Sequence, residues 1–177
     1  MKKLLVVVDF QVDFVVGTLG FEGAEALDER IASQIEAYLE EGQDVVCTYD
    51  THFEDYLETK EGRGLPITHC VKGTPGWELY GRTGKLLENA KSFEKYTFGS
   101  FEFGEYLLEN PYDEIRFVGL VTNICVISNA VIAKSVLPEA QIIIDAKATG
   151  SADLSLHHKA LEVMQSMLMQ IDNWERQ

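Results

Sequence analysis

Three residues that together could attack a carbonyl group stand far apart in the sequence: Asp9, Lys95 and Cys125. Cys125 lies in the segment GLVTNIC at the start of a predicted helix, where unpaired amides and the helix dipole favour the nucleophilic thiolate and can stabilise an oxyanion. Asp9 offers a carboxylate to accept the thiol proton, and Lys95 offers an ammonium to stabilise the anions that result. Taken singly, these residues are also typical of a core thiol, a strand-end cap and a surface charge, so the prediction depends on their meeting in space.

A second group has the residue types of a metal site. Asp50 and His52 are separated by one residue, and His69 is followed by Cys70. One carboxylate and two imidazoles form a mixed oxygen and nitrogen ligand set for Zn²⁺ or another divalent ion, with positions left for water or substrate. Histidines that are simply hydrogen-bonded are the alternative, because the spacing matches no standard structural zinc motif.

Alternating apolar segments and helical periods predict an α/β fold with a parallel sheet. Strands are predicted at residues 4–8, 44–48, 115–120 and 141–144, which are apolar on both faces, with further strands at 92–96 and 167–171. A first helix is predicted at residues 27–39 and is ended by Gly42. A second helix is predicted to begin at an Asn123 cap and to run to about residue 136, where Pro138 stops it. A third helix is predicted after Asp153. Residues 52–87 show no clear period, and so long an irregular region is usually functional.

The predicted strands bring the polar residues together. Ligands bind at the carboxyl ends of the strands in open α/β sheets. Six residues end or follow predicted strands and should therefore meet at this edge: Asp9, Asp50, His52, Lys95, Cys125 and Asp145. Cys47, in the middle of a predicted strand, is interpreted as a core residue.

Length and composition limit the remaining possibilities. A chain of 177 residues predicts one domain, residues 1–177, and no apolar run reaches the roughly 20 residues of a membrane span. Three cysteines without a disulfide spacing favour a reducing, cytoplasmic compartment. The net charge of −14 disfavours nucleic acids and anionic membranes as partners, and the bulky DFQVDF turn lacks the glycine-rich loop of a nucleotide-binding domain.

The chain resembles the isochorismatase-like cysteine hydrolases, and within them the nicotinamidases. The similarity rests on six motifs in the family's order: DFQVDF (9–14), DTH (50–52), HCVKGTPGWEL (69–79), KYTFGSF (95–101), GLVTNICV (119–126) and DA (145–146). It implies a Rossmann-like three-layer α/β/α sandwich with a six-stranded, mainly parallel sheet. It also implies a homo-oligomer, either a dimer or a tetramer.

The resemblance also implies residue roles. Asp9 would be the general base, Lys95 the charge stabiliser and Cys125 the nucleophile. A cis peptide bond between Leu120 and Val121 would direct the amides of Val121 and Cys125 into an oxyanion hole.

The nicotinamidase branch implies a bound divalent ion, Zn²⁺ with Fe or Mn as alternatives, and no nucleotide cofactor. Its ligands would be Asp50, His52 and His69, with Glu61 as a further carboxylate and Glu58 as the less well-spaced alternative. The ion would hold the pyridine nitrogen of nicotinamide, and Phe14 would pack against the ring.

The sequence departs from the family pattern at two places, the first beside Cys125 and the second on the substrate side. Asn123 stands where the family usually has Asp, and the stretch 65–68 lacks the aromatic residue that nicotinamidases have shortly before the second metal histidine. Phe98, Phe101 and Trp77 are the candidates for a replacement ring.

The expected activity is hydrolysis of a small amide, nicotinamide to nicotinate and ammonia, through a thioester on Cys125. Isochorismatases and ureido or carbamoyl-amide hydrolases of the same superfamily are the nearest alternatives, followed by a non-catalytic binding domain on the same scaffold.

Overall fold

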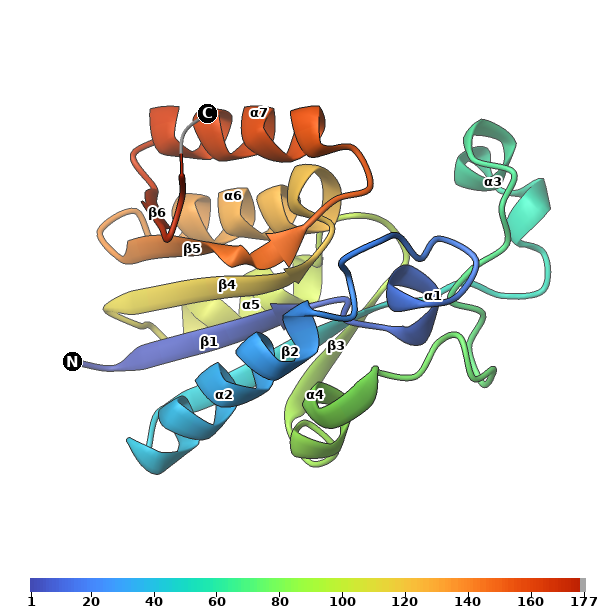
Figure 1. Cartoon of the computed structure of the whole chain (residues 1–177). Coiled ribbons are helices and arrows are strands. Elements are labelled where there is room, and N and C mark those ends of the chain that lie inside the picture. The colour runs from blue at the N-terminus through green and yellow to red at the C-terminus, as the bar shows by residue number, and fades with distance from the viewer. Residues whose placement is uncertain (176–177) are drawn as a thin grey trace.

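The computed structural model describes residues 1–175 and contains a six-stranded sheet in the order β3-β2-β1-β4-β5-β6 (Figure 1). Every pair of neighbouring strands is parallel. The strands are β1 (Lys3–Val8), β2 (Asp44–Asp50), β3 (Lys91–Lys95), β4 (Glu114–Leu120), β5 (Gln141–Gly150) and β6 (Gln170–Asp172). The predicted α/β fold is confirmed, with β5 running on to Gly150 where an end at residue 144 was expected.

Helices cover both faces of the sheet, which makes a three-layer sandwich (Figure 1). One face carries α5 (Phe101–Glu109), α6 (Ile127–Val136) and α7 (Leu154–Ser166), and the other carries α2 (Leu27–Glu40) with α4 (Gly81–Leu86) packed beside it. This double cover explains why the apolar residues of β1 from Leu4 to Val8 are fully buried. Cys47 of β2 is likewise a buried core residue, as predicted.

Helix ends agree with the sequence signals at two places and differ at a third. The chain leaves α2 through Gly42 at φ +67°, and the Asp153 side chain caps α7 by accepting a hydrogen bond from the Leu156 N–H. The predicted Asn123 cap is wrong. Val121 is the cap residue, and the chain passes directly from β4 into a π-helical turn (Thr122–Val126) that continues as α6. The helical turn thus starts two residues too early for Asn123 to cap it.

The loops of the sheet's carboxyl edge are long and carry short helices. They include α1 (Val12–Val15), a 3₁₀ turn (Tyr56–Glu58) and α3 (Lys60–Gly64), and α3 projects away from the sheet (Figure 1). The first part of the irregular segment 52–87 therefore lies at the edge where the predicted site residues end, while its last part forms α4 beside α2. Among the described residues, no helix is long and apolar enough to cross a membrane.

A glycine lets two central strands approach closely just before this edge. Gly119 of β4 has φ +105°, and a Cβ atom there would lie 2.1 Å from the Val8 carbonyl oxygen of β1. Only glycine combines this backbone conformation with this space. Gly119 therefore helps to set the distance between the strand that leads to Asp9 and the strand that leads to Cys125.

Candidate active site and metal centre

Asp9, Lys95 and Cys125 meet at the carboxyl edge of the sheet. Asp9 follows the last residue of β1, Lys95 is the last residue of β3, and Cys125 lies in the turn after β4. The Lys95 Nζ is 2.6 Å from Asp9 Oδ2 and 3.4 Å from Cys125 Sγ, and all three side chains are buried. The structure thus brings together the three residues that the sequence analysis selected, while their catalytic roles stay a prediction.

Burial dominates the electrostatics of this trio. It raises the pKa of the Cys125 thiol well above its ordinary value, because the opposing effect of Lys95 is offset by Asp9 and Asp50. Burial also raises the pKa of Asp9, against the effect of Lys95. Burial alone would lower the pKa of Lys95, but the neighbouring anionic groups raise it well above the usual value, so this side chain stays an ammonium.

The resting sulfur is therefore a thiol and needs a proton acceptor. The sequence analysis expected the first helical turn to favour the thiolate, whereas burial and the neighbouring carboxylates of Asp9 and Asp50 raise the pKa of the thiol. Asp9 is the neighbouring carboxylate, and it is held in place by a 2.6 Å hydrogen bond that the Thr48 hydroxyl donates to Oδ1.

Four side chains beside the trio have the composition of a metal site. Ligand atoms of Asp50, His52, Glu61 and His69 all lie within 4.8 Å of one another. His52 Nε2 is 3.1 Å from Asp50 Oδ2 and 3.6 Å from Glu61 Oε1. His69 Nδ1 is 2.7 Å from the Ile67 carbonyl, which orients the ring so that Nε2 faces the group. Two imidazoles and two carboxylates fit Zn²⁺ and also suit Fe or Mn.

Glu61 belongs to this four-residue group, which we call the metal cluster, and Glu58 does not. Glu61 comes from α3, the short helix that projects from the sheet, and the Thr59 side chain caps this helix by accepting from the Gly62 N–H. A residue of the irregular segment thus lies next to strand-end residues, on a short helix whose first turn is capped by Thr59.

Asp50 connects the trio and the metal cluster. Its Oδ1 is 3.2 Å from the Lys95 ammonium, and its Oδ2 is 3.1 Å from His52 Nε2 and 3.4 Å from His69 Nε2. Burial alone would raise the pKa of Asp50, but its hydrogen bonds to the two imidazoles and the charge of Lys95 hold it well below its usual range. Asp50 is therefore a carboxylate.

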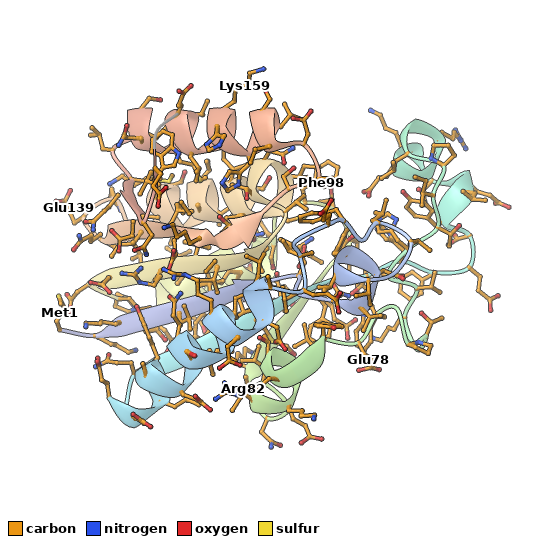
Figure 2. The ribbon with its side chains drawn as sticks, in the orientation of Figure 1. Met1, Glu78, Arg82, Phe98, Glu139 and Lys159 are labelled. Carbon is orange, nitrogen blue, oxygen red and sulfur yellow. The ribbon has the colours of Figure 1, made fainter. Side chains whose placement is uncertain are left out.

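A cavity of about 230 Å³ opens onto both groups. Phe14 and Phe98 line it, as predicted, together with Cys125, Asp50 and His69. The Phe14 ring makes an edge contact with the His69 ring at 5.6 Å between centroids. Phe98 lies beyond the carboxyl ends of the strands, on the side of the molecule from which α3 projects (Figure 2).

Two of the candidate rings lie elsewhere. Phe101, at the first position of α5, is 78% exposed. Trp77 packs against Tyr49 and donates a hydrogen bond to the Thr51 hydroxyl. Neither residue lines the cavity, so the structure does not place either ring where the missing aromatic was expected.

The sequence analysis missed Leu19, Phe21 and Leu65, which complete the apolar wall of the cavity. Leu65 lies in the stretch singled out for its lack of an aromatic side chain, which was a usable signal. Leu19 and Phe21 lie in a loop without periodicity, and no local pattern marks them.

The turn that carries Cys125 has the predicted backbone. The peptide bond between Leu120 and Val121 is cis. The Val121 carbonyl accepts hydrogen bonds from the N–H groups of Ile124 and Val126, which flank Cys125. Val121 and Cys125 both line the cavity, and the role of their amides as an oxyanion hole stays a prediction.

Asp145 does not join the site, and this prediction is wrong. Because β5 continues to Gly150, Asp145 lies in the middle of the strand and not at its carboxyl end. Its carboxylate accepts hydrogen bonds from Arg30, Gln34 and Asn173. Asp145 therefore ties α2 to the far strands of the sheet.

Comparison with known proteins agrees with this geometry. The crystal structure of nicotinamidase PncA from Bacillus subtilis has a TM-score of 0.86 and 32% identity, covering 97% of this chain and 99% of that one. The pyrazinamidase of Pyrococcus horikoshii in complex with zinc has a TM-score of 0.85 and 26% identity, covering 98% and 100%. The nicotinamidase/pyrazinamidase of Mycobacterium tuberculosis is 28% identical over 187 residues, 96% of this chain and 97% of that protein. The isochorismatase domain model matches residues 3–175, and so the chain belongs to the isochorismatase family.

Proposed function

We propose that this protein is a nicotinamidase-type amidohydrolase that converts nicotinamide to nicotinate and ammonia. The observation that carries the proposal is the Lys95 ammonium held between Asp9 and Cys125, because Cys125 lines a cavity that is also lined by three members of the metal cluster, Asp50, Glu61 and His69. Its similarity to nicotinamidases along nearly the whole chain supports the same activity.

The reaction begins with Cys125. The thiol transfers its proton to Asp9 as the sulfur attacks the amide carbon, and a C–S bond forms while the carbonyl oxygen becomes an oxyanion. The amides of Val121 and Cys125 stabilise this oxyanion, and the Lys95 ammonium stabilises the charge on Asp9 and the sulfur. The C–N bond then breaks as Asp9 returns the proton to the leaving nitrogen, which yields ammonia and a thioester.

Hydrolysis of the thioester completes the cycle. Asp9 takes a proton from a water molecule that attacks the acyl carbon, and the C–S bond breaks as the sulfur regains a proton. The products are the free acid and the resting thiol. The raised pKa of Asp9 suits a group that takes up and returns a proton. The raised pKa of the Cys125 thiol opposes its ionisation, so the neighbouring base is needed for the attack.

The metal cluster would hold one divalent ion, most simply Zn²⁺, through Asp50, His52, Glu61 and His69. The zinc bound by the Pyrococcus horikoshii pyrazinamidase supports this choice of ion. When bound, the ion would supply a Lewis acid that binds a ring nitrogen of the substrate. This chain's own residues would orient the ring through Phe14, which contacts His69, and through the other apolar side chains that line the cavity.

The cavity favours a small, flat substrate. Its volume of about 230 Å³ is below the roughly 300–1,000 Å³ of typical pockets for drug-sized ligands. Phe14, Phe21 and Phe98 offer ring faces and edges, and the carboxylates nearby disfavour an anionic substrate. A neutral single-ring amide therefore fits better than isochorismate, which carries carboxylates.

Ammonia release from nicotinamide and a panel of small amides and ureido compounds tests the proposal. We expect turnover of nicotinamide by the purified protein and its loss in Cys125→Ala, with a thioester adduct trapped on the wild type alone. Turnover of a ureido compound or isochorismate with none of nicotinamide would move the protein to another branch of the family. Retained turnover in Cys125→Ala would reject the nucleophile.

A further inference from the structure

Gln11, two residues after Asp9, holds the backbone of a metal-cluster residue. Its side chain is fully buried. The side-chain NH₂ donates to the Asp50 carbonyl at 2.9 Å and to the Trp77 carbonyl at 2.8 Å, while Oε1 accepts from the Asp50 N–H at 2.8 Å. Both backbone polar groups of Asp50 are therefore bound by one side chain, which fixes the direction of its carboxylate.

Asp13, on the next turn of the same segment, holds the backbone of the two histidines. Its Oδ2 accepts a 2.8 Å hydrogen bond from the N–H of Cys70, the residue after His69. Cys70 has φ +46°, a conformation that non-glycine residues rarely adopt, and its carbonyl accepts a 2.9 Å hydrogen bond from the His52 N–H. One carboxylate thus supports the link between both imidazole ligands.

The surroundings of Asp13 are shaped for this contact. Cβ atoms added at Gly17 or Gly76 would lie 2.3 Å and 2.2 Å from the Asp13 carboxylate oxygens, so both glycines leave the space that the carboxylate fills. Asp13 is not itself a member of the metal cluster. Its contribution to that cluster runs through hydrogen bonds to the backbone.

We propose that Gln11 and Asp13 are positioning residues of the metal cluster, which set the affinity for the ion by fixing the backbone of Asp50, His52 and His69. Outer-shell partners of this kind typically change metal affinity by about 10- to 100-fold when they are replaced. The inference rests on the metal site of the proposed function and goes beyond it. It makes the segment after Asp9 a common support for the general base and the ligands.

The test measures Zn²⁺ affinity of the full-length protein by competition with a chromophoric chelator, after metal removal and a check of folding by circular dichroism. We expect Asp13→Ala to raise the Kd for Zn²⁺ about 10- to 100-fold. Asp13→Asn keeps an oxygen that can accept from the Cys70 N–H, so it should recover most of the affinity.

Asp28→Ala is the matched control. Asp28 is also half-buried, accepts from the backbone N–H groups of Arg82 and Thr83, and fills space left by a glycine, since a Cβ at Gly81 would lie 2.2 Å from its carboxylate. It lies outside the metal cluster, so its loss should destabilise the fold without changing the Kd for Zn²⁺.

Gln11→Glu provides an independent arm. The variant keeps an oxygen to accept from the Asp50 N–H but loses the two hydrogen bonds donated by the amide NH₂, and we expect a Kd for Zn²⁺ raised at least about tenfold.

The outcomes separate the inference from the proposed function. A wild-type protein that binds no Zn²⁺ would overturn the metal site and this inference together. Wild-type binding with an unchanged Kd in folded Asp13→Ala and Gln11→Glu would overturn the positioning role alone. An equal loss of affinity in Asp13→Ala and Asp28→Ala would do the same, because general destabilisation would then explain it.

Discussion

His157 contacts the turn that carries Cys125 and makes the stability of the fold depend on pH. The residue lies in α7 and is 7% exposed, and its Nδ1 is hydrogen-bonded to the Thr122 hydroxyl at 2.8 Å. Burial, and then the neighbouring His158, lowers the pKa of His157 from 6.5 to about 4. The folded protein therefore holds a neutral imidazole at a pH where the unfolded chain already binds a proton.

The sign and size of the effect follow from these two pKa values. Because the unfolded state binds the extra proton first, the stability contribution of neutral His157 is complete above about pH 6.5 and is lost as the pH falls toward 4. The loss between pH 7 and pH 5 amounts to about 2 kcal/mol in the free energy of unfolding.

Urea unfolding of the wild type and His157→Gln at several pH values measures this term. Other titrating groups act equally in both proteins, so the difference between the two free energies of unfolding isolates His157. We expect the advantage of the wild type to shrink by about 2 kcal/mol from pH 7 to pH 5. Parallel curves for the two proteins would refute the reasoning, and so would an imidazole signal of His157 that titrates near pH 6.5 in NMR of the folded protein.

Three further predictions concern the site and its frame. Lys95→Met leaves the buried carboxylates of Asp9 and Asp50 without their ammonium partner. We expect amidase activity to disappear and the free energy of unfolding in urea to fall by about 3–5 kcal/mol. Wild-type stability in this variant would contradict the buried ion pair. Removal of the metal by a chelator should lower the midpoint temperature of thermal unfolding, and added Zn²⁺ should restore it. The midpoint temperature of His52→Ala should change with neither the chelator nor Zn²⁺. Gly119→Ala would place a Cβ atom 2.1 Å from the Val8 carbonyl oxygen in a backbone conformation with φ +105°. We expect the free energy of unfolding in urea to fall by more than about 2 kcal/mol, or the variant not to fold. Soluble protein of wild-type stability would contradict this prediction.

The sequence predicted the strands and the residues at their ends better than it predicted the cavity wall. Asp9 and Cys125 follow from short apolar runs, because buried parallel strands leave a strong local signal and their carboxyl ends must meet. Lys95 ends the edge strand β3, whose sequence KSFEK is mostly polar and gives a weaker signal. Asp145 was misplaced because β5 continues through a less apolar stretch, where no local signal marks the end. The Asn123 cap was wrong because a cap residue must stand just before the first helical residue. Here the helical turn begins at Thr122, directly after β4 and Val121, so Asn123 already lies inside it. Phe21 and Leu65 reach the cavity through loop conformations that depend on tertiary contacts.

The shared carboxylate of Asp50 makes the two halves of the site thermodynamically dependent on each other. One oxygen faces the ammonium of Lys95 and the other faces the imidazoles. A cation held by the imidazoles would neutralise part of the Asp50 charge and so weaken its hold on the Lys95 proton. By reciprocity, the protonation state around Lys95 changes the affinity for the cation by the same factor. In the proposed enzyme, the acidity of the groups around Lys95 and the affinity for the ion are therefore coupled, and exchanging Zn²⁺ for another divalent ion should shift the pH profile of the reaction as well as its rate.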